Sequence, residues 1–131
     1  MLGGASPAAI ADQCLRYEPE VNLVGTLVRK TFPEQPNYES IRSGDAAATY
    51  FFISLPTAFC VSPGPDKDLP SVARVAEVQL MFSGETNSYK ALRPYLGKKV
   101  MCRGHLWPQQ TGHHHSQVLI ADALCKPVES L

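Results

Sequence analysis

Five segments rich in β-branched and apolar residues, with one helical segment between the third and the fourth, set the strongest constraint on the fold of this chain. The strand-like segments are residues 21–32, 49–55, 72–82, 98–107 and 117–125. This order of elements is that of the five-stranded Greek-key OB barrel. We therefore expect an all-β fold with one short helix, an OB-like barrel. Another small β-barrel or sandwich with an incidental helix is the competing interpretation.

The third segment has the clearest strand pattern. Val78, Leu80 and Phe82 share one face. Glu77 and Gln79 point the other way, the period of two that is typical of a half-buried sheet. We therefore expect Gln79 on a solvated face.

Glycines mark the first strand-like segment and the end of the helical one. Gly25 stands where a bulge or sharp bend is expected. Tyr89, Leu92 and Leu96 are spaced by three and four residues and are followed by Gly97, which predicts a short helix within residues 86–96.

Two loops are candidates for function. Residues 33–47 form a loop of about fifteen residues, longer than a connection needs, and residues 108–116 carry three consecutive histidines. Residues 56–70 hold a dense cluster of turn-forming residues, so we expect the chain to leave the sheet there. In OB barrels the loops after the first strand and between the last two strands flank one binding face. The candidate binding residues are Asn37, Tyr38, Glu39, Ser40, Asp45, Trp107, Thr111, His113, His114 and His115.

The histidines allow two interpretations. His113 and His115 are two apart in an extended segment, so they project to one side and could bind a transition metal ion such as Zn²⁺, with Glu39 or Asp45 as a third ligand. The favoured alternative is that the histidines hydrogen-bond to loop backbone through ring N–H to carbonyl bonds and brace the hairpin. We therefore expect no cofactor and keep Zn²⁺ as the minor alternative.

The four cysteines are even in number and contain no C-x-x-C pair, which favours disulfides over a zinc ribbon. Three pairings are open. If the last two strands form a hairpin around Gly112, Cys102 and Cys125 lie almost opposite each other, which leaves Cys14 with Cys60. Free buried thiols are the alternative.

The N-terminal residues 1–11 are small and apolar and end in an Ala-x-Ala spacing, as the remnant of an export signal would. A disordered N-terminus is the alternative. We expect residues 12–131 to form a single OB-like domain that is periplasmic or secreted.

Charge excludes several classes of partner. Twelve Lys and Arg balance twelve Asp and Glu in 131 residues, so no global field attracts nucleic acid. A local basic cluster favours a solvated face over a nucleic-acid site. Its members are Lys90, Arg93, Lys98, Lys99 and Arg103. The longest apolar run, residues 46–55, is well short of the ~18 residues that span a bilayer.

Catalytic motifs find little support. Ser40 follows Glu39, but there is no G-x-S-x-G motif, and Glu39 and Asp45 fit turn formation better than a carboxylate pair. We do not expect an enzyme.

Several short motifs together resemble a bacterial family catalogued as domain of unknown function 4431. They are Cys14 to Pro19, Thr31 to Pro33, Pro36 to Ile41, Gly44-Asp45, Gly97 to Val100, and Thr111 to His115, leaving residues 61–90 unmatched. The resemblance implies export to the bacterial periplasm and carries no activity with it.

Small size, expected disulfides and two prominent loops favour a periplasmic module that binds another protein. An inhibitor or immunity-type protein against a secreted toxin or wall-active enzyme fits this description. The alternative is a barrel that binds a small ligand or a transition metal ion with residues 38–45 and 113–115.

Overall fold

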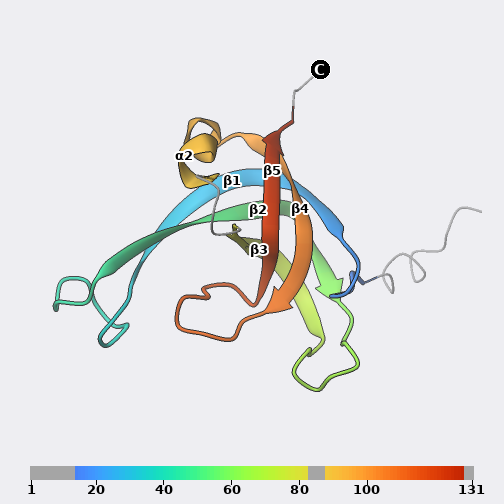
Figure 1. Ribbon diagram of the computed structural model, residues 1–131, viewed down its shortest axis with the longest axis horizontal. Helices are drawn as coiled ribbons and strands as arrows, with labels where there is room; N and C mark the ends of the chain where they lie inside the picture. Colours follow the sequence, from blue (N-terminus) through green and yellow to red (C-terminus); the bar gives the residue numbers. More distant parts are fainter. Residues whose placement is uncertain (1–13, 83–87, 129–131) are drawn as a thin grey trace, which may run out of the picture.

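The five expected strands form a closed barrel in a computed structural model that describes residues 14–82 and 88–128 (Figure 1). Its elements are β1 (Val21–Pro33), β2 (Ala47–Val61), β3 (Val72–Met81), α2 (Ser88–Leu92), the 3-10 helix η1 (Arg93–Tyr95), β4 (Lys99–Pro108) and β5 (Val118–Pro127). The strand order is β1-β2-β3-β5-β4, and β1 also pairs with β4. Among the pairings of the five described strands, only that of β3 with β5 is parallel. The predicted all-β OB-like barrel is confirmed.

β1 belongs to both halves of the barrel. Its first part, Val21 to Thr26, pairs with β4, and its second part, from Thr26 onward, pairs with β2. Gly25 lies at this change of partner, and a Cβ atom there would be 2.3 Å from the backbone oxygen of Ser54. Glycine therefore lets β1 pass close to β2 where the barrel closes. The registers of β1 with β2 and β4 run without a shift, so the bulge considered at Gly25 is not formed.

β2 is longer than predicted. The expectation that the chain leaves the sheet within residues 56–70 is confirmed by loop 62–71, but the strand predicted to end at residue 55 continues past Pro56 to Val61. Its register with β3 shifts on both sides of Phe59, and an irregular ladder tolerates Pro56, which has no N–H to donate. The N-terminal segment supports this extension, since Leu15 bridges to Val61 and donates its N–H to the oxygen of Cys60 at 2.8 Å.

The barrel interior is filled by inward-pointing apolar side chains. Phe51 and Ile53 of β2 and Val78 and Leu80 of β3 belong to this core. Gln79 points outward, as its alternation requires, but it is completely buried. The expectation of a solvated face at Gln79 is therefore wrong.

α2 and η1 close one end of the barrel (Figure 1). Leu92 is buried in the core. Gly97 has a φ of +82° and donates its N–H to the oxygen of Leu27 at 2.7 Å. The helix end predicted at Gly97 is confirmed, while residues 86 and 87, with which the predicted helix begins, lie outside the described residues.

Two disulfides join the four cysteines in the predicted pairs. Cys102 and Cys125 are directly opposed in the β4–β5 ladder, and Cys14 is joined to Cys60. Disulfides persist in oxidising compartments, so the structure indicates an extracytoplasmic environment. The predicted signal remnant, residues 1–11, lies outside the described residues. No helix within residues 14–82 and 88–128 is long and apolar enough to span a membrane.

Both disulfides should be present in the native protein. We expect a thiol assay on denatured, unreduced protein to find no free thiol. Replacing both Cys14 and Cys60 by Ser should lower the free energy of unfolding by about 2–4 kcal/mol, because the bridge restricts the unfolded chain. Urea titration under non-reducing conditions measures this change, and a thiol count near four would contradict the pairing.

Candidate functional site

Loop 34–46, between β1 and β2, and loop 109–117, between β4 and β5, extend from the same side of the barrel (Figure 1). We call these two loops the rim. Tyr38 and His113 form an edge-to-face contact with ring centroids 6.4 Å apart. A Cβ atom on Gly112 would lie 2.8 Å from the ring of Tyr38, so only glycine admits the ring so closely. The predicted meeting of the two loops is confirmed.

The centre of the rim is the carboxylate of Glu34, whose side chain is only 7% exposed. His115 donates from Nε2 to one carboxylate oxygen at 3.0 Å, and His113 donates from Nδ1 to the other. The hydroxyl of Tyr50 also donates to this second oxygen, at 3.1 Å. These bonds fix the N–H on Nδ1 of His113 and on Nε2 of His115. Three donors replace the water that the buried carboxylate has lost.

Gln79 holds the backbone of loop 109–117 between the two histidines. Its side-chain amide donates to the oxygen of His113 at 2.9 Å, and its side-chain oxygen accepts the N–H of His115 at 2.6 Å. The Gln79 backbone N–H donates to the hydroxyl of Ser116 at 3.0 Å. The loop thus lies over the outer face of β3, which explains why Gln79 is buried.

Aromatic contacts extend this cover over β1 and β2. The ring of His115 stacks on Phe32, with centroids 3.8 Å apart and planes 2° from parallel. Phe32 also contacts Phe52, with centroids 5.8 Å apart. Phe52 is fully buried, although the inward orientation of Phe51 and Ile53 places it on the outer face. The outer face of β1 to β3 near the rim is therefore occupied by the chain itself.

His114 points away from Glu34 and braces its own loop. Its Nδ1 accepts the N–H groups of Gln110 at 2.9 Å and of Thr111 at 3.3 Å. The predicted bracing by histidine is confirmed for His114, with the roles reversed, because the ring accepts from the backbone instead of donating to a carbonyl. Thr111 contributes through its hydroxyl, which accepts the N–H of His113 at 3.2 Å.

Asp45 organises loop 34–46. One carboxylate oxygen accepts the N–H of Asn37 at 2.9 Å, and the other accepts those of Glu39 and Ser40 at 2.8 and 2.9 Å. Ser40 also receives the N–H of Asp45 on its own backbone oxygen at 3.1 Å. These contacts give Asp45, Asn37 and Ser40 a structural role in shaping the loop.

The carboxylate that the histidines reach is Glu34, where the metal hypothesis named Glu39 or Asp45. Glu39 is exposed, and its contact with Asp45 is made through its backbone. Within the described part of the chain, no group of three or more His, Cys, Asp or Glu side chains is arranged to hold a metal ion.

Trp107 lies apart from Tyr38. Its side chain is 47% exposed. It lines one cavity with Tyr17 and Leu69 and another with His114. Among the ring contacts of the described residues, Tyr38 pairs with His113 and with no other ring.

Glu34 and Gln79 are central to the rim, and the sequence pointed to neither. Glu34 directly follows Pro33 at the end of β1. The turn-forming residues around it suggest an exposed loop, so its burial could not be predicted from the local sequence. A signal for it was available, because His113 and His115 were expected to project to one side of their loop, where a carboxylate of the facing loop could accept from both rings. Gln79 carried no local signal, since an alternating strand gives the same pattern with or without a covering loop.

Ionisation couples the rim to pH. Burial acts to raise the pKa of Glu34, but the hydrogen bonds from His115, His113 and Tyr50 outweigh it and lower that pKa. Backbone hydrogen bonds lower the pKa of Asp45, and burial lowers the pKa of His114. Burial, with the hydrogen bond to Glu34, raises the pKa of Tyr50 to about 12, so its hydroxyl remains a donor at neutral pH.

The lowered pKa values of Glu34, Asp45 and His114 all predict a smaller free energy of unfolding at acid pH. The carboxylates of Glu34 and Asp45 stabilise the fold above their unfolded pKa values of about 4.3 and 3.9, and this contribution is lost as the pH falls through their lower folded values. Neutral His114 stabilises the fold above about pH 6.5, and its contribution is lost as the pH falls through its lowered folded pKa. Acid should therefore loosen the rim.

Glu34→Gln should isolate the contribution of the buried carboxylate. Gln keeps the volume but loses the charge and one acceptor oxygen, so we expect a loss of about 1–3 kcal/mol in the free energy of unfolding at neutral pH. The difference from the wild type should shrink as the pH falls through the folded pKa of Glu34. Urea titrations from neutral to acid pH measure it.

Glu39→Gln is the matched control, because it removes the same charge from an exposed side chain of the same loop and should change stability little. A difference between wild type and Glu34→Gln that stays constant over the whole pH range would contradict the role of Glu34 as an ionised acceptor.

Comparisons with known proteins add a family and no activity. Comparisons with curated proteins and with solved structures found no match. Residues 77–122 match the family model described as "Domain of unknown function (DUF4431)". The matched segment contains the triple-histidine motif. The N-terminal motifs of the expected resemblance lie outside this segment. Residues 77–90, which we expected to be unmatched, lie within it. Gln79, His113 and His115 thus come from the matched segment, whereas Glu34 does not. The DUF4431 model thus covers a segment of this chain that runs from within β3 into β5.

Proposed function

We propose that the protein is a periplasmic or secreted binding module that recognises another protein through the rim. An inhibitor or immunity-type protein that binds a secreted toxin or a wall-active enzyme acts in this way. The observation that carries the proposal is an exposed apolar pair on a braced loop. Tyr38 is 39% exposed and Ile41 is 44% exposed, and both belong to loop 34–46.

The backbone of this loop is fixed before any partner arrives. Asp45 holds three of its N–H groups, and Tyr38 donates its own N–H to the oxygen of Glu34 at 2.8 Å. Ordering a loop on binding costs free energy, so a loop that is already ordered binds more tightly for the same contact area. Tyrosine is also enriched among the residues that dominate protein interfaces.

The polar groups of the rim favour a protein partner over a small polar ligand. The ring nitrogens of His113 and His115 that point inward are bonded to Glu34, and Nδ1 of His114 is bonded to backbone N–H groups. A polar ligand needs convergent donors and acceptors that are open to it. The rim also offers the exposed apolar side chains of Tyr38 and Ile41, and a protein interface uses such side chains at its centre.

Tyr38→Ala should weaken binding of the partner by about tenfold or more, the scale of an interface hot spot. The partner is obtained by capture from cell-envelope extract on immobilised protein, then purified and titrated against both forms by calorimetry. Tyr38→Phe should retain most of the affinity, because it keeps the ring.

Val24→Thr is the control, since Val24 lies on β1 and is 39% exposed, the same fraction as Tyr38. We expect it to bind as the wild type does. Capture of no protein, or equal affinity of the wild type and Tyr38→Ala, would overturn the proposal.

The alternative is a small ligand or a transition metal ion held beside the same loops. One observation favours it. A broad cavity of about 590 Å³ opens between β3 and loop 109–117, and Phe32, Glu77, His114 and His115 contribute to its lining.

Calorimetry decides on the metal ion. We expect Zn²⁺ added to metal-free wild type to give no more heat than it gives with a variant in which His113, His114 and His115 are all Ala. The reason is that Glu34 and the loop backbone already occupy the ring nitrogens described above. A saturable heat that only the wild type shows would establish the alternative and count against the bracing role.

A further inference from the structure

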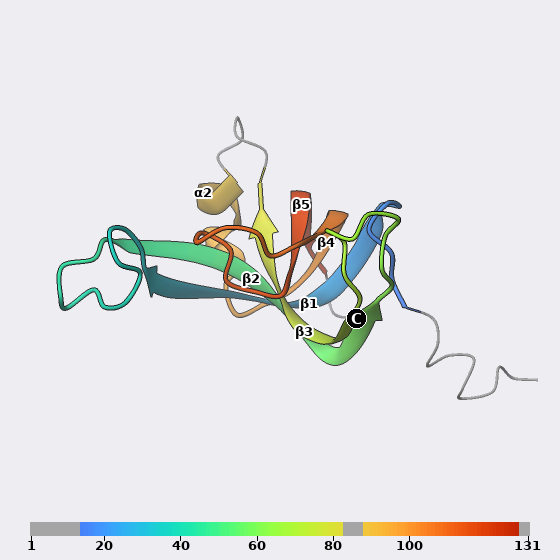
Figure 2. The ribbon, with the colours of Figure 1, turned by 90° about the horizontal axis from the view of Figure 1, so that it is seen from below.

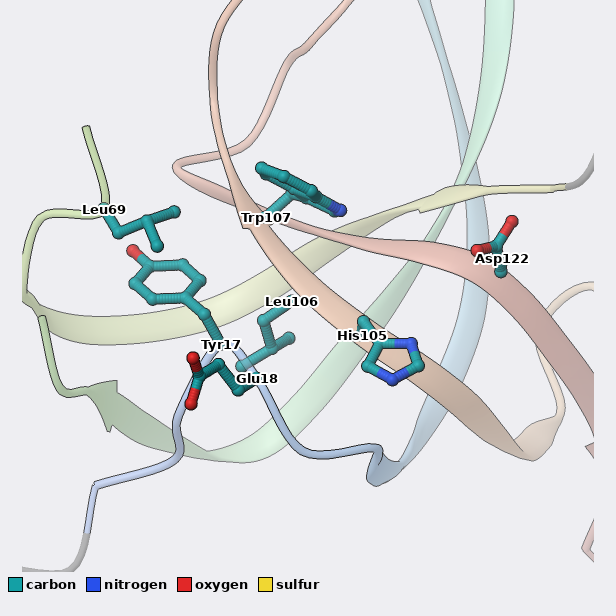
Figure 3. A pocket seen from close by; sticks show the side chains of 7 residues that line it. All are labelled: Tyr17, Glu18, Leu69, His105, Leu106, Trp107 and Asp122. Carbon is teal, nitrogen blue, oxygen red and sulfur yellow. The ribbon is translucent and has the colours of Figure 1, made fainter. Parts of the chain in front are cut away.

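A second candidate site lies on the outer surface of β4 and β5, around Trp107. It is a cavity of about 270 Å³, small beside the roughly 300–1,000 Å³ of sites for drug-sized ligands, and so it suits a group of side-chain size. Trp107 and His105 come from β4, and Asp122 comes from β5. Figure 3 shows Tyr17, Glu18 and Leu69 on one side of β4 and Asp122 on the other, with Trp107 between them.

The apolar part of this cavity is firmly built. Tyr17 is buried, and its hydroxyl donates to the oxygen of Pro70 at 2.6 Å, which holds the ring beside loop 62–71. Trp107 is about half exposed, so its indole ring forms an accessible wall. A wall of this kind binds flat or cationic groups by stacking.

The charge of the cavity has one sign. Among the described residues that line it, Glu18 and Asp122 are acidic and none is a Lys or Arg. Neither carboxylate takes part in an ion pair with another of the described residues. The nearest basic residue along β4, Arg103, pairs with Glu20 at 3.7 Å. The cavity therefore presents two unpaired carboxylates beside an exposed aromatic ring.

We propose that this cavity binds a guanidinium group, stacked on the indole of Trp107 and attracted by the negative charge of Glu18 and Asp122. A guanidinium is planar, is weakly hydrated and carries N–H donors at its edge, so it can stack on a ring and bond to carboxylates at the same time. An ammonium group offers a point charge without the flat face, so it should bind more weakly.

The residues that line the guanidinium site lie outside the two loops of the rim, although Trp107 also lines a separate cavity with Gln110 and His114 of loop 109–117. The residues that form the guanidinium site belong to β4, β5, the segment before β1 and loop 62–71. In both ribbon views, loop 62–71 lies at the opposite end of the molecule from loop 34–46 (Figures 1 and 2). Failure of the protein-binding proposal would leave this inference untouched, and the reverse also holds.

Trp107 is the only tryptophan of the chain, so its fluorescence reports on this cavity directly. We expect N-acetyl-arginine amide to change the emission saturably at about pH 8, where most histidines are neutral. The citrulline analogue, which has nearly the same shape but no charge, should give no saturable change, and the lysine analogue should bind more weakly. Added salt should weaken the binding.

Glu18→Gln and Asp122→Asn should each weaken binding by about threefold to tenfold. Asn suits position 122, where φ is +53°, because Asn tolerates this conformation as Asp does. Asp66→Asn, an exposed carboxylate that does not line the cavity, is the charge-matched control and should bind as the wild type does. Equal thermal midpoints would show that all three variants fold.

A titration with free L-arginine distinguishes two sources of the guanidinium group, an arginine side chain of a polypeptide and the free amino acid. Tighter binding of the blocked amide would assign the site to an arginine in a polypeptide, and tighter binding of free arginine would assign it to the amino acid. Equal responses to arginine and citrulline derivatives, or unchanged affinity in both carboxylate variants, would overturn the proposal.

Discussion

The buried carboxylate of Glu34 is the contact on which the rim depends. A carboxylate without water is costly unless donors surround it, and here the donors come from Tyr50 of β2 and from two histidines 79 and 81 residues further along the chain. Loop 109–117 must therefore adopt one arrangement, in which both rings face the same way. Gln79 fixes the backbone between those rings. The two loops consequently form one ordered unit, although neither contains regular secondary structure.

This arrangement changes how the barrel can be used. In OB barrels the outer face of the second and third strands, between these same two loops, is the usual binding surface. In this chain Phe52 and Gln79 belong to that face and are both fully buried. The cover is the chain's own loop, attached by the amide of Gln79 and by the stack of His115 on Phe32. An oligonucleotide laid along this face would have to displace that loop.

Much of the fold could be predicted because period-two patterns and connection lengths are local properties. The barrel order followed from them, and the disulfide pairs followed from the expected opposition of Cys102 and Cys125. The failures share a physical cause, which is dependence on distant contacts. β2 passes Pro56 because the N-terminal segment supports its end. The burial of Gln79 and Glu34 depends on a loop more than 30 residues away along the chain. The metal hypothesis named Glu39 or Asp45 as the carboxylate beside His113 and His115, and this choice is wrong. Asp45 is engaged by its own loop's backbone, and the histidines contact Glu34.

The two candidate surfaces use their polar groups in opposite ways. At the rim, the carboxylates of Glu34 and Asp45 accept hydrogen bonds from the loops themselves. The exposed surface that we propose for a partner is the apolar pair of Tyr38 and Ile41. Such a surface gains affinity from being ordered in advance. Around Trp107, the carboxylates of Glu18 and Asp122 form no ion pair with another described residue, so that cavity can select a ligand by its charge. At the apolar pair, a partner of the wrong shape loses packing contacts, so shape selects the partner there. At the cavity, a ligand of the wrong charge loses an ion pair, so charge selects the ligand.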